Sequence, residues 1–271
     1  MQNLAFFDTL LNYIQINIKG CSHITHDCNW HETGCKVDYD LWIVLDGTIK
    51  LCMQDHEYTA HPNDIIFLYP QTLYQASAGT DTCTFIYTHF DFKLGNNARI
   101  LNDFSLAGHM PGQKAREEVT SYITSYWHYK KKPLSTLTLK GYFTVLLSKV
   151  IEYQYMQNKA FAPQNKNSKR LIRLQPTIQY VINHLDKPLH IGQLARVCGM
   201  SEKYFITYFK KTLGITPGSY ITQLKMNKAL DYLYEHKYSV KEIAYLLGYP
   251  DPYAFSKAFK KYYKAAPTKY I

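Results

Sequence analysis

No apolar run in this 271-residue sequence approaches the roughly 20 residues of a membrane-spanning helix. The opening segment, MQNLAFFDTLLNYIQ, contains Asp8 and lacks the basic leader of a secretory signal. These absences predict a cytoplasmic protein without a membrane partner. In that compartment we expect all six cysteines to remain reduced thiols.

The sequence also lacks the motifs of common enzyme classes. It contains no Gly-rich phosphate loop, no G-x-S-x-G elbow and no H-E-x-x-H pair. We therefore predict no enzymatic activity, no catalytic residues and no cofactor.

The segment CSHITHDCNWHETGC carries the residue types that bind zinc, but not at a zinc-site spacing. Its candidates are Cys21, His23, His26, Cys28, His31 and Cys35. Cysteines seven residues apart match no common C-x₂₋₄-C pair, and strand alternation would separate some candidates onto opposite faces. We predict no metal site here, with a zinc site as the alternative.

Acidic residues are scarce in the last 111 residues of the chain. Residues 161–271 hold 18 Lys and Arg against 6 Asp and Glu, a net charge of +12, whereas residues 1–160 hold 13 against 15, a net of −2. This asymmetry indicates a polyanion-binding half, with nucleic acid as the commonest partner. An acidic membrane surface and a merely solvated lysine-rich surface are the alternatives.

Short strand-like runs fill residues 1–110. YDLWIVLDGTIKLCM has Asp46-Gly47 between two such runs, which predicts a hairpin, and HPNDIIFLYPQ and CTFIYTHFDF add further strands. Strands at close spacing without intervening helices predict an antiparallel barrel or sandwich.

Residues 111–159 predict a helical pair that packs on the first domain or on a second copy of the chain. In the second helix apolar residues recur at three- and four-residue spacing, namely Leu139, Phe143, Leu146, Leu147, Val150, Ile151 and Tyr155. The polar segment AFAPQNKNSKR then predicts an interdomain linker over residues 160–171.

A repeat occupies the basic half: KYFITYFKKTL is followed 50 residues later by YAFSKAFKKYY. Upstream, IGQLARVCGM lies over VKEIAYLLGY at an offset of 49. Each copy has a helix with a small Ala, a Gly about four residues later, and Ser201 or Asp251 as N-cap of a second helix. This is the pattern of a helix-turn-helix unit. Two copies are too few for a solenoid, the structural alternative.

The 3.6-residue period turns the repeated phenylalanines, such as Phe205 and Phe255, inward, and polar residues and lysines outward. Such a face can meet base edges and phosphates in a major groove. A long amphipathic helix in PGSYITQLKMNKALDYLYEH would hold the two units at a fixed separation.

The string from LARVCGM to APTKYI strongly resembles the DNA-binding domain of AraC/XylS-type transcriptional regulators over roughly residues 172–271. The resemblance implies base contacts by Lys203, Ile206, Thr207, Tyr253, Ser256 and Lys257, which are the residues of the outward faces. We expect the neighbouring lysines to contact phosphates, namely Lys210, Lys211, Lys260 and Lys261. Two residues depart from the family pattern: Lys225 replaces the usual Arg, and Lys264 the usual Gly.

The segment from WHETGC to YPQTLYQ resembles, more loosely, the cupin-like effector domain of sugar-responsive members of that family. It lacks the clustered metal signature of enzymatic cupins. Aromatic rings with polar tips suit a sugar, so the pocket candidates are Trp30, His31, Trp42, Tyr87 and His89. Simple core filling by these rings is the alternative.

Together these features predict an α+β multidomain protein: a cupin-like β-barrel with a helical pair, then an all-α domain with twin helix-turn-helix units. The predicted function is a homodimeric transcriptional regulator that binds double-stranded DNA and responds to a small molecule, with a sugar as the expected effector. RNA polymerase is a candidate further partner. Two alternatives are an effector-independent regulator whose barrel only dimerises, and a cupin enzyme fused to a basic module.

Overall fold

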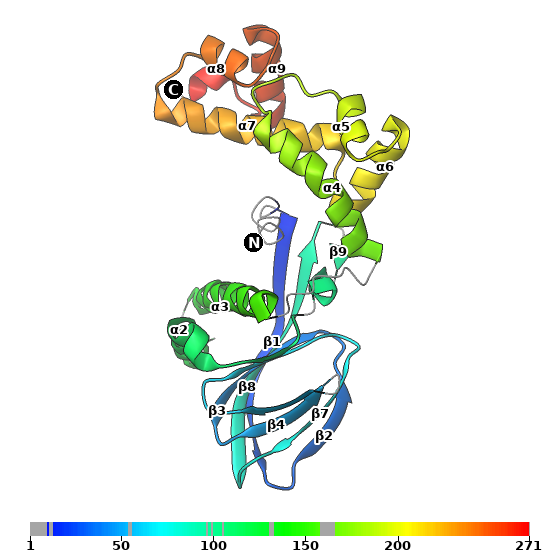
Figure 1. The fold of residues 1–271 in the computed structure, drawn as a ribbon. Helices are drawn as coiled ribbons and strands as arrows, with labels where there is room; N and C mark the ends of the chain where they lie inside the picture. The colour runs from blue at the N-terminus through cyan, green and yellow to red at the C-terminus, as the bar shows by residue number, and fades with distance from the viewer. Residues whose placement is uncertain are drawn as a thin grey trace. The chain divides into compact units, whose positions relative to one another are not determined.

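The computed structural model describes residues 10, 13–53, 56–95, 97–98, 100–104, 106–129, 133–157 and 166–270 (Figure 1). The described chain forms two compact units, one within residues 12–165 and one that comprises residues from 166 onward together with Leu10. The first is built from antiparallel sheets with two helices, and the second is entirely helical. A mixed architecture with N-terminal strands and C-terminal helices is thus confirmed.

Two antiparallel sheets make up most of the first unit. Its strands are β1 (Ile14–Asp27), β2 (His31–Cys35), β3 (Tyr39–Asp46), β4 (Ile49–Met53), β5 (His56–Ala60), β6 (Ile65–Leu68), β7 (Leu73–Ala78), β8 (Thr82–Leu94), β9 (Asn97–Ala98) and β10 (Gly108–Met110). The larger sheet has the order β1-β8-β3-β6-β10, with β9 paired to β8, and the smaller has the order β2-β7-β4-β5.

The two sheets pack face to face because successive side chains along each strand point to opposite faces, and the apolar side chains of one face meet those of the other sheet. In β3, Trp42 and Val44 join a core cluster with Leu51 and Met53 of β4, and all four are buried. The intervening residues of β3 face away from this core. The larger sheet therefore buries both of its faces.

The predicted hairpin at Asp46-Gly47 is wrong, because β3 and β4 belong to different sheets. Gly47 has a φ of 69°, and an added Cβ would lie 2.0 Å from the carbonyl oxygen of Thr82. The Thr48 amide donates to Thr80 Oγ1 at 2.9 Å. The turn is thus held against the connection between β7 and β8, and the chain crosses from one sheet to the other.

Helices α2 (Arg116–Trp127) and α3 (Ser135–Gln157) belong to the same unit and lie side by side (Figure 1). Phe143 of α3 meets Phe90 of β8 edge-on, with ring centroids 4.9 Å apart. The apolar stripe predicted for α3 is confirmed from Leu139 to Ile151, whereas Tyr155 is only half-buried. The second face of the larger sheet is covered in this way.

The helical unit contains α4 (Lys166–Asn183), α5 (Ile191–Val197), α6 (Glu202–Leu213), α7 (Pro217–Glu235), α8 (Val240–Leu246) and α9 (Pro252–Tyr263). Helix α7 lies between the pairs α5–α6 and α8–α9 along the chain and contacts both α6 and α8 (Figure 1). Within the described residues, no helix is long and apolar enough to span a bilayer.

The linker predicted over residues 160–171 is only partly testable, because residues 160–165 lie outside the described chain. From Lys166 onward the backbone is helical, so residues 166–171 form the start of α4. Within the part of α4 whose burial is described, the buried residues are Leu171, Leu174, Thr177, Ile178 and Val181. The first five residues of the helix, KNSKR, are all polar, so the sequence has no apolar pattern there that would predict a helix.

Candidate functional site

The first helix pair joins α5 to α6 through a tight turn. Gly199 in this turn has a φ of 63°, a left-handed conformation that favours glycine. The Met200 amide closes the turn by donating to the Ala195 carbonyl oxygen at 3.0 Å. On α6, Phe205 and Phe209 are fully buried, so the opposite face of the helix points outward.

The second pair, α8 and α9, repeats this design with better capping. Asp251 Oδ1 accepts a 2.7 Å hydrogen bond from the Ala254 amide, and Pro252 begins the helix. Gly248 has a φ of 64° at the place equivalent to Gly199. Phe255 and Phe259 are fully buried. The sequence repeat is therefore a repeat of structure.

The outward faces of α6 and α9 carry the residues predicted to read bases. Lys203, Ile206 and Thr207 are exposed on α6, as are Tyr253 and Lys257 on α9. Tyr253 is 77% exposed. The sixth candidate, Ser256, is half-buried and therefore lies at the margin of the exposed face.

The lysines predicted to contact phosphates lie in the last turn of each of these helices. Lys210 and Lys211 end α6, and Lys260 and Lys261 end α9. All four are exposed, and in the part of the chain that the structure describes none of them forms an ion pair. Their charges are thus available to an external anion.

Lys225 of α7 connects the two helix pairs. Its side chain is buried, and Nζ donates to the carbonyl oxygens of Lys187 at 2.9 Å and Leu247 at 2.6 Å. Lys187 precedes α5, and Leu247 is the C-cap residue of α8. Gly248 lies against the same segment, because an added Cβ would come within 2.4 Å of the Lys187 carbonyl carbon. Burial lowers the pKa of Lys225.

In the first unit the predicted effector residues do not form one group. Trp42 is buried in the core, and Trp30 and Tyr87 pack against that core. His89 lies on the same face of β8 as Tyr87, with ring centroids 5.2 Å apart. His31 differs, because it is exposed and lines a shallow hollow on the outer face of the smaller sheet.

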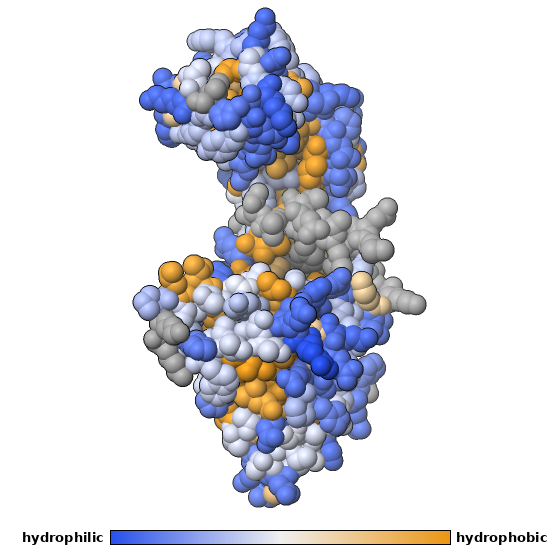
Figure 2. All heavy atoms as spheres, turned by 90° about the vertical axis from the view of Figure 1, so that its left-hand side faces the viewer, coloured by the Kyte–Doolittle hydropathy of each residue, from blue (hydrophilic) through white to orange (hydrophobic). Residues whose placement is uncertain are grey.

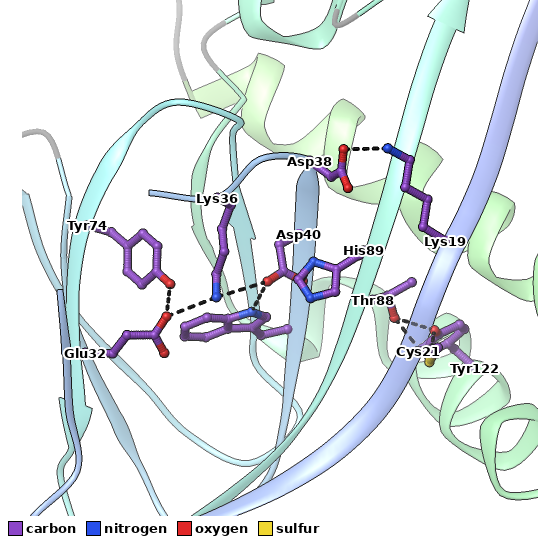
Figure 3. A network of polar contacts seen from close by, with 11 residues as sticks. Lys19, Cys21, Glu32, Lys36, Asp38, Asp40, Tyr74, Thr88, His89 and Tyr122 are labelled. Atoms are coloured by element: carbon purple, nitrogen blue, oxygen red, sulfur yellow. Dashed lines mark hydrogen bonds and ion pairs between the residues drawn. The ribbon is translucent and has the colours of Figure 1, made fainter. Parts of the chain in front are cut away.

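A polar cluster is formed by Glu32, Lys36, Asp40, Trp42, Tyr74 and His89. Figure 3 shows the labelled side chains of Glu32, Lys36, Asp40, Tyr74 and His89 pointing toward one another. Glu32 Oε1 accepts hydrogen bonds from Tyr74 and, at 3.0 Å, from Lys36 Nζ. The Trp42 indole donates to Asp40 Oδ2 at 2.8 Å. Asp40 is fully buried, and its Oδ1 accepts no hydrogen bond.

The pKa values of the two carboxyl groups of the polar cluster are shifted in opposite directions. Burial raises the pKa of Asp40 despite the opposing effects of His89, Trp42 and Lys36. Burial alone would also raise the pKa of Glu32, but hydrogen bonds from Tyr74 and Lys36 bring it below its usual value.

Sequence reasoning missed four members of this cluster: Glu32, Lys36, Asp40 and Tyr74. One signal was present, since Asp40 interrupts the apolar run from Tyr39 to Val44. A carboxyl group inside a buried strand needs partners, and such groups mark functional sites more often than surface charges do.

Two of the candidate metal residues, Cys21 and His23, contact α2. Cys21 Sγ lies 3.2 Å from the Tyr122 hydroxyl of α2, and His23 Nδ1 lies 2.7 Å from the Tyr126 hydroxyl. Cys28 and Cys35 are exposed. Among the described residues, no group of three or more potential ligands lies close enough to hold a metal ion.

Exposed lysines at the ends of two similar helices, with polar outward faces, define a helix-turn-helix DNA-binding protein as the class. Comparisons with known proteins agree. Residues 194–271 match the helix-turn-helix domain family. The Msm operon regulatory protein of Streptococcus mutans is 25% identical over 240 residues, covering 86% of this chain and 84% of the relative. The transcriptional activator RhaS of Mannheimia succiniciproducens is 24% identical over 86% of both chains.

The chain is thus similar to transcriptional regulators of the AraC/XylS type. Its sequence is 29% identical to the C-terminal domain of AraT from Geobacillus stearothermophilus, with a TM-score of 0.35, covering 36% of this chain and 82% of that one. ToxT of Vibrio cholerae is 15% identical, with a TM-score of 0.37, over 95% of this chain and 94% of that one.

Proposed function

We propose that the chain regulates transcription by placing α6 and α9, as twin helix-turn-helix units, in successive major grooves of one operator. The observation that carries this proposal is the repetition of one exposed face on two helices of a single compact unit. Two such helices on one side of a duplex must lie about one helical turn, roughly 34 Å, apart. Helix α7 sets that separation.

In this proposal the outward residues of the two helices have two separate roles. Lys203, Ile206 and Thr207 of α6 and Tyr253, Ser256 and Lys257 of α9 contact base edges, which supply specificity. The four terminal lysines contact phosphates, which supply affinity regardless of sequence. Thr207 supports the assignment of base contacts to this face. Its hydroxyl donates to Lys203 O in its own helix, and rotation of the side chain would turn that hydroxyl outward.

Selection of binding sites from a random DNA library by the full chain tests these roles. Thr207→Ala and Lys257→Ala should each relax base preference at one operator position, at a cost of about 1–3 kcal/mol. Lys261→Ala is the matched control: it should weaken binding to all sequences alike and reduce the salt slope by about one charge. Unaltered selected motifs for Thr207→Ala and Lys257→Ala would refute the assigned faces.

We propose further that the N-terminal unit is a cupin-like domain that senses a small molecule. Two relatives have sugar operons in their names: the raffinose operon regulatory protein RafR of Pediococcus pentosaceus, 32% identical over 34% of each chain, and the lactose operon activator of Staphylococcus xylosus. Melting of the full chain against a sugar panel tests this idea. If no compound shifts the melting temperature, the effector-independent alternative is favoured.

The exposed side of α3 supports a homodimer. Leu137, Val145 and Met156 are 65%, 49% and 54% exposed on this helix, whose opposite side is buried. Apolar side chains are visible among polar ones on the molecular face that carries α2 and α3 (Figure 2). A helix that is apolar on both sides normally has a partner on both. The partner that we propose is α3 of a second copy.

Sedimentation of Val145→Asp tests the dimer. A carboxylate at the centre of an apolar interface should shift the chain to the monomer, because it would be buried without a partner. Thr144→Asp is the control, since Thr144 is an exposed neighbour outside the apolar set. A dimer that persists in Val145→Asp would exclude this face.

A further inference from the structure

The ammonium group of Lys36 occupies a box of aromatic and anionic groups. Its Nζ lies 5.3 Å from the ring centroids of both Trp42 and Tyr74. It also donates to Glu32 Oε1 at 3.0 Å (Figure 3). Aromatic faces combined with a carboxylate are the groups that proteins use to recognise organic ammonium ions. The box is therefore built for an ammonium group.

Lys36 fills this box incompletely. Its Nζ stays 3.7 Å from Asp40 Oδ2, which is too long for a hydrogen bond. Asp40 Oδ1 has no donor, and His89 Nδ1 stops 3.6 Å away. A buried carboxylate oxygen without a donor is costly. Asp40 Oδ1 can therefore accept a hydrogen bond that the ammonium group of Lys36, attached to the backbone, does not donate.

The box also has access to solvent on one side. The side chains of Glu32, Lys36 and His89 are 33%, 22% and 35% exposed, whereas Asp40 behind them is fully buried. Lys36 lies on the short connection between β2 and β3, and its neighbour Val37 is 74% exposed. The lysine side chain can therefore swing outward without disturbing either strand.

We propose that the box formed by Glu32, Asp40, Trp42 and Tyr74 binds the ammonium group of a small organic amine. The ammonium group of Lys36 occupies the box when this amine is absent. An untethered primary ammonium has three N–H donors, so it can approach Asp40 while keeping the bond to Glu32. Entry of the amine releases the Lys36 side chain, while the Gln71 amide still holds the Lys36 carbonyl oxygen at 2.9 Å. This inference rests on the proposed sensing function only for its consequence at the DNA, not for the binding itself.

Chemical rescue of the full chain tests the box. Lys36→Ala removes the lysine side chain from the box. The space left matches n-butylammonium, which has the same four carbons and ammonium group as that side chain. Because a competing internal ligand lowers apparent affinity by the fraction of time it is bound, the variant should bind butylammonium about tenfold or more tightly than the unmodified chain. Binding is followed by tryptophan fluorescence, since Trp42 forms one wall of the box.

Three comparisons make the result specific. Uncharged n-butanol should not saturate the same signal, and Glu32→Gln in the Lys36→Ala background should remove butylammonium binding. Lys50→Ala, which removes an exposed lysine from β4, should behave like the unmodified chain. Equal responses to butanol and butylammonium, or equal affinities of Lys36→Ala and Lys50→Ala, would overturn the proposal.

The unmodified chain supplies a second measurement should Lys36→Ala fold poorly. A lysine ammonium held by a carboxylate gives an observable ¹⁵N–¹H signal, and butylammonium should remove this signal for Lys36 in a saturable manner. A Lys36 signal that persists at all concentrations would refute displacement. DNA affinity is then measured with and without the amine. Binding that leaves DNA affinity unchanged would retain the ammonium site and refute only its role as an effector site.

Discussion

At the scale of single residues, Lys264 is in a conformation that suits glycine. It caps α9 with a φ of 62°, whereas the equivalent cap of α6 is Gly214 with a φ of 85°. A left-handed conformation costs a residue with a Cβ roughly 1–2 kcal/mol. We expect Lys264→Gly to stabilise the helical unit by about 0.5–1 kcal/mol after the entropy cost of glycine. Denaturant unfolding of the full chain measures this.

The reverse substitution provides the control for this residue. Gly214→Lys should destabilise the same unit, because it places a Cβ where the backbone is left-handed. Lys264→Ala separates conformation from contact, since it removes the 3.1 Å bond from Nζ to the Lys261 carbonyl but keeps the Cβ. Stabilisation by Lys264→Ala equal to that by Lys264→Gly would show that the backbone strain is unimportant.

At the scale of elements, the first helix of each pair begins differently. Helix α8 has a capping box, in which Ser239 Oγ accepts from the Glu242 amide and Glu242 accepts from the Ser239 amide at 2.7 Å. The N-cap residue of helix α5 is His190, whose side chain makes no capping bond. We expect Ser239→Ala to cost about 1 kcal/mol in unfolding experiments. His190→Ala should cost much less, and equal costs would contradict this difference.

The capping box also predicts a pH dependence. Hydrogen bonds from the Ser239 backbone and hydroxyl lower the pKa of Glu242. A carboxyl group with a lowered pKa in the folded state stabilises the fold above its unfolded pKa, near 4.3, and loses that effect as pH falls through the folded pKa. The difference in unfolding free energy between the wild type and Glu242→Gln should therefore be present at pH 7 and disappear in acid. A difference independent of pH would show that ionisation is irrelevant.

At the scale of the molecule, the separation of α6 and α9 depends on the contacts at Lys225. Lys225→Met leaves the Lys187 and Leu247 carbonyls without their donor, which should loosen the two helix pairs relative to each other. We expect the wild type to discriminate strongly against operators whose half-sites are moved by one base pair. The ratio of the affinity for the correctly spaced operator to that for the shifted operator should fall toward one in Lys225→Met, as measured by DNA titration.

Two further variants separate positioning from simple loss of stability. Lys225→Arg keeps buried donors and should retain the preference for one spacing. Gly248→Ala should lose it, because the new Cβ would collide with the Lys187 backbone. An unchanged spacing ratio in both Lys225→Met and Gly248→Ala, with uniformly weaker binding, would assign Lys225 a purely structural role.

Much of the helical unit could be predicted from the sequence, because its signals are local. The repeat of Phe205 and Phe209 in Phe255 and Phe259 predicts which sides of α6 and α9 are buried, since a helix face depends only on the 3.6-residue period. Turn glycines such as Gly199 are equally local. The assignment of the outward residues to particular bases remains a prediction.

What the sequence determined by itself is therefore the periodic pattern: the two helix pairs, the buried stripe of α3 and the charge of the basic half. Only the tertiary structure decided how strands pair, which is why Asp46-Gly47 proved to be a crossing between sheets and not a hairpin. It also decided the surroundings of Asp40, because His89 approaches its carboxyl group from the distant strand β8. Contacts between residues distant in sequence carry no local period, so folding alone brings them together.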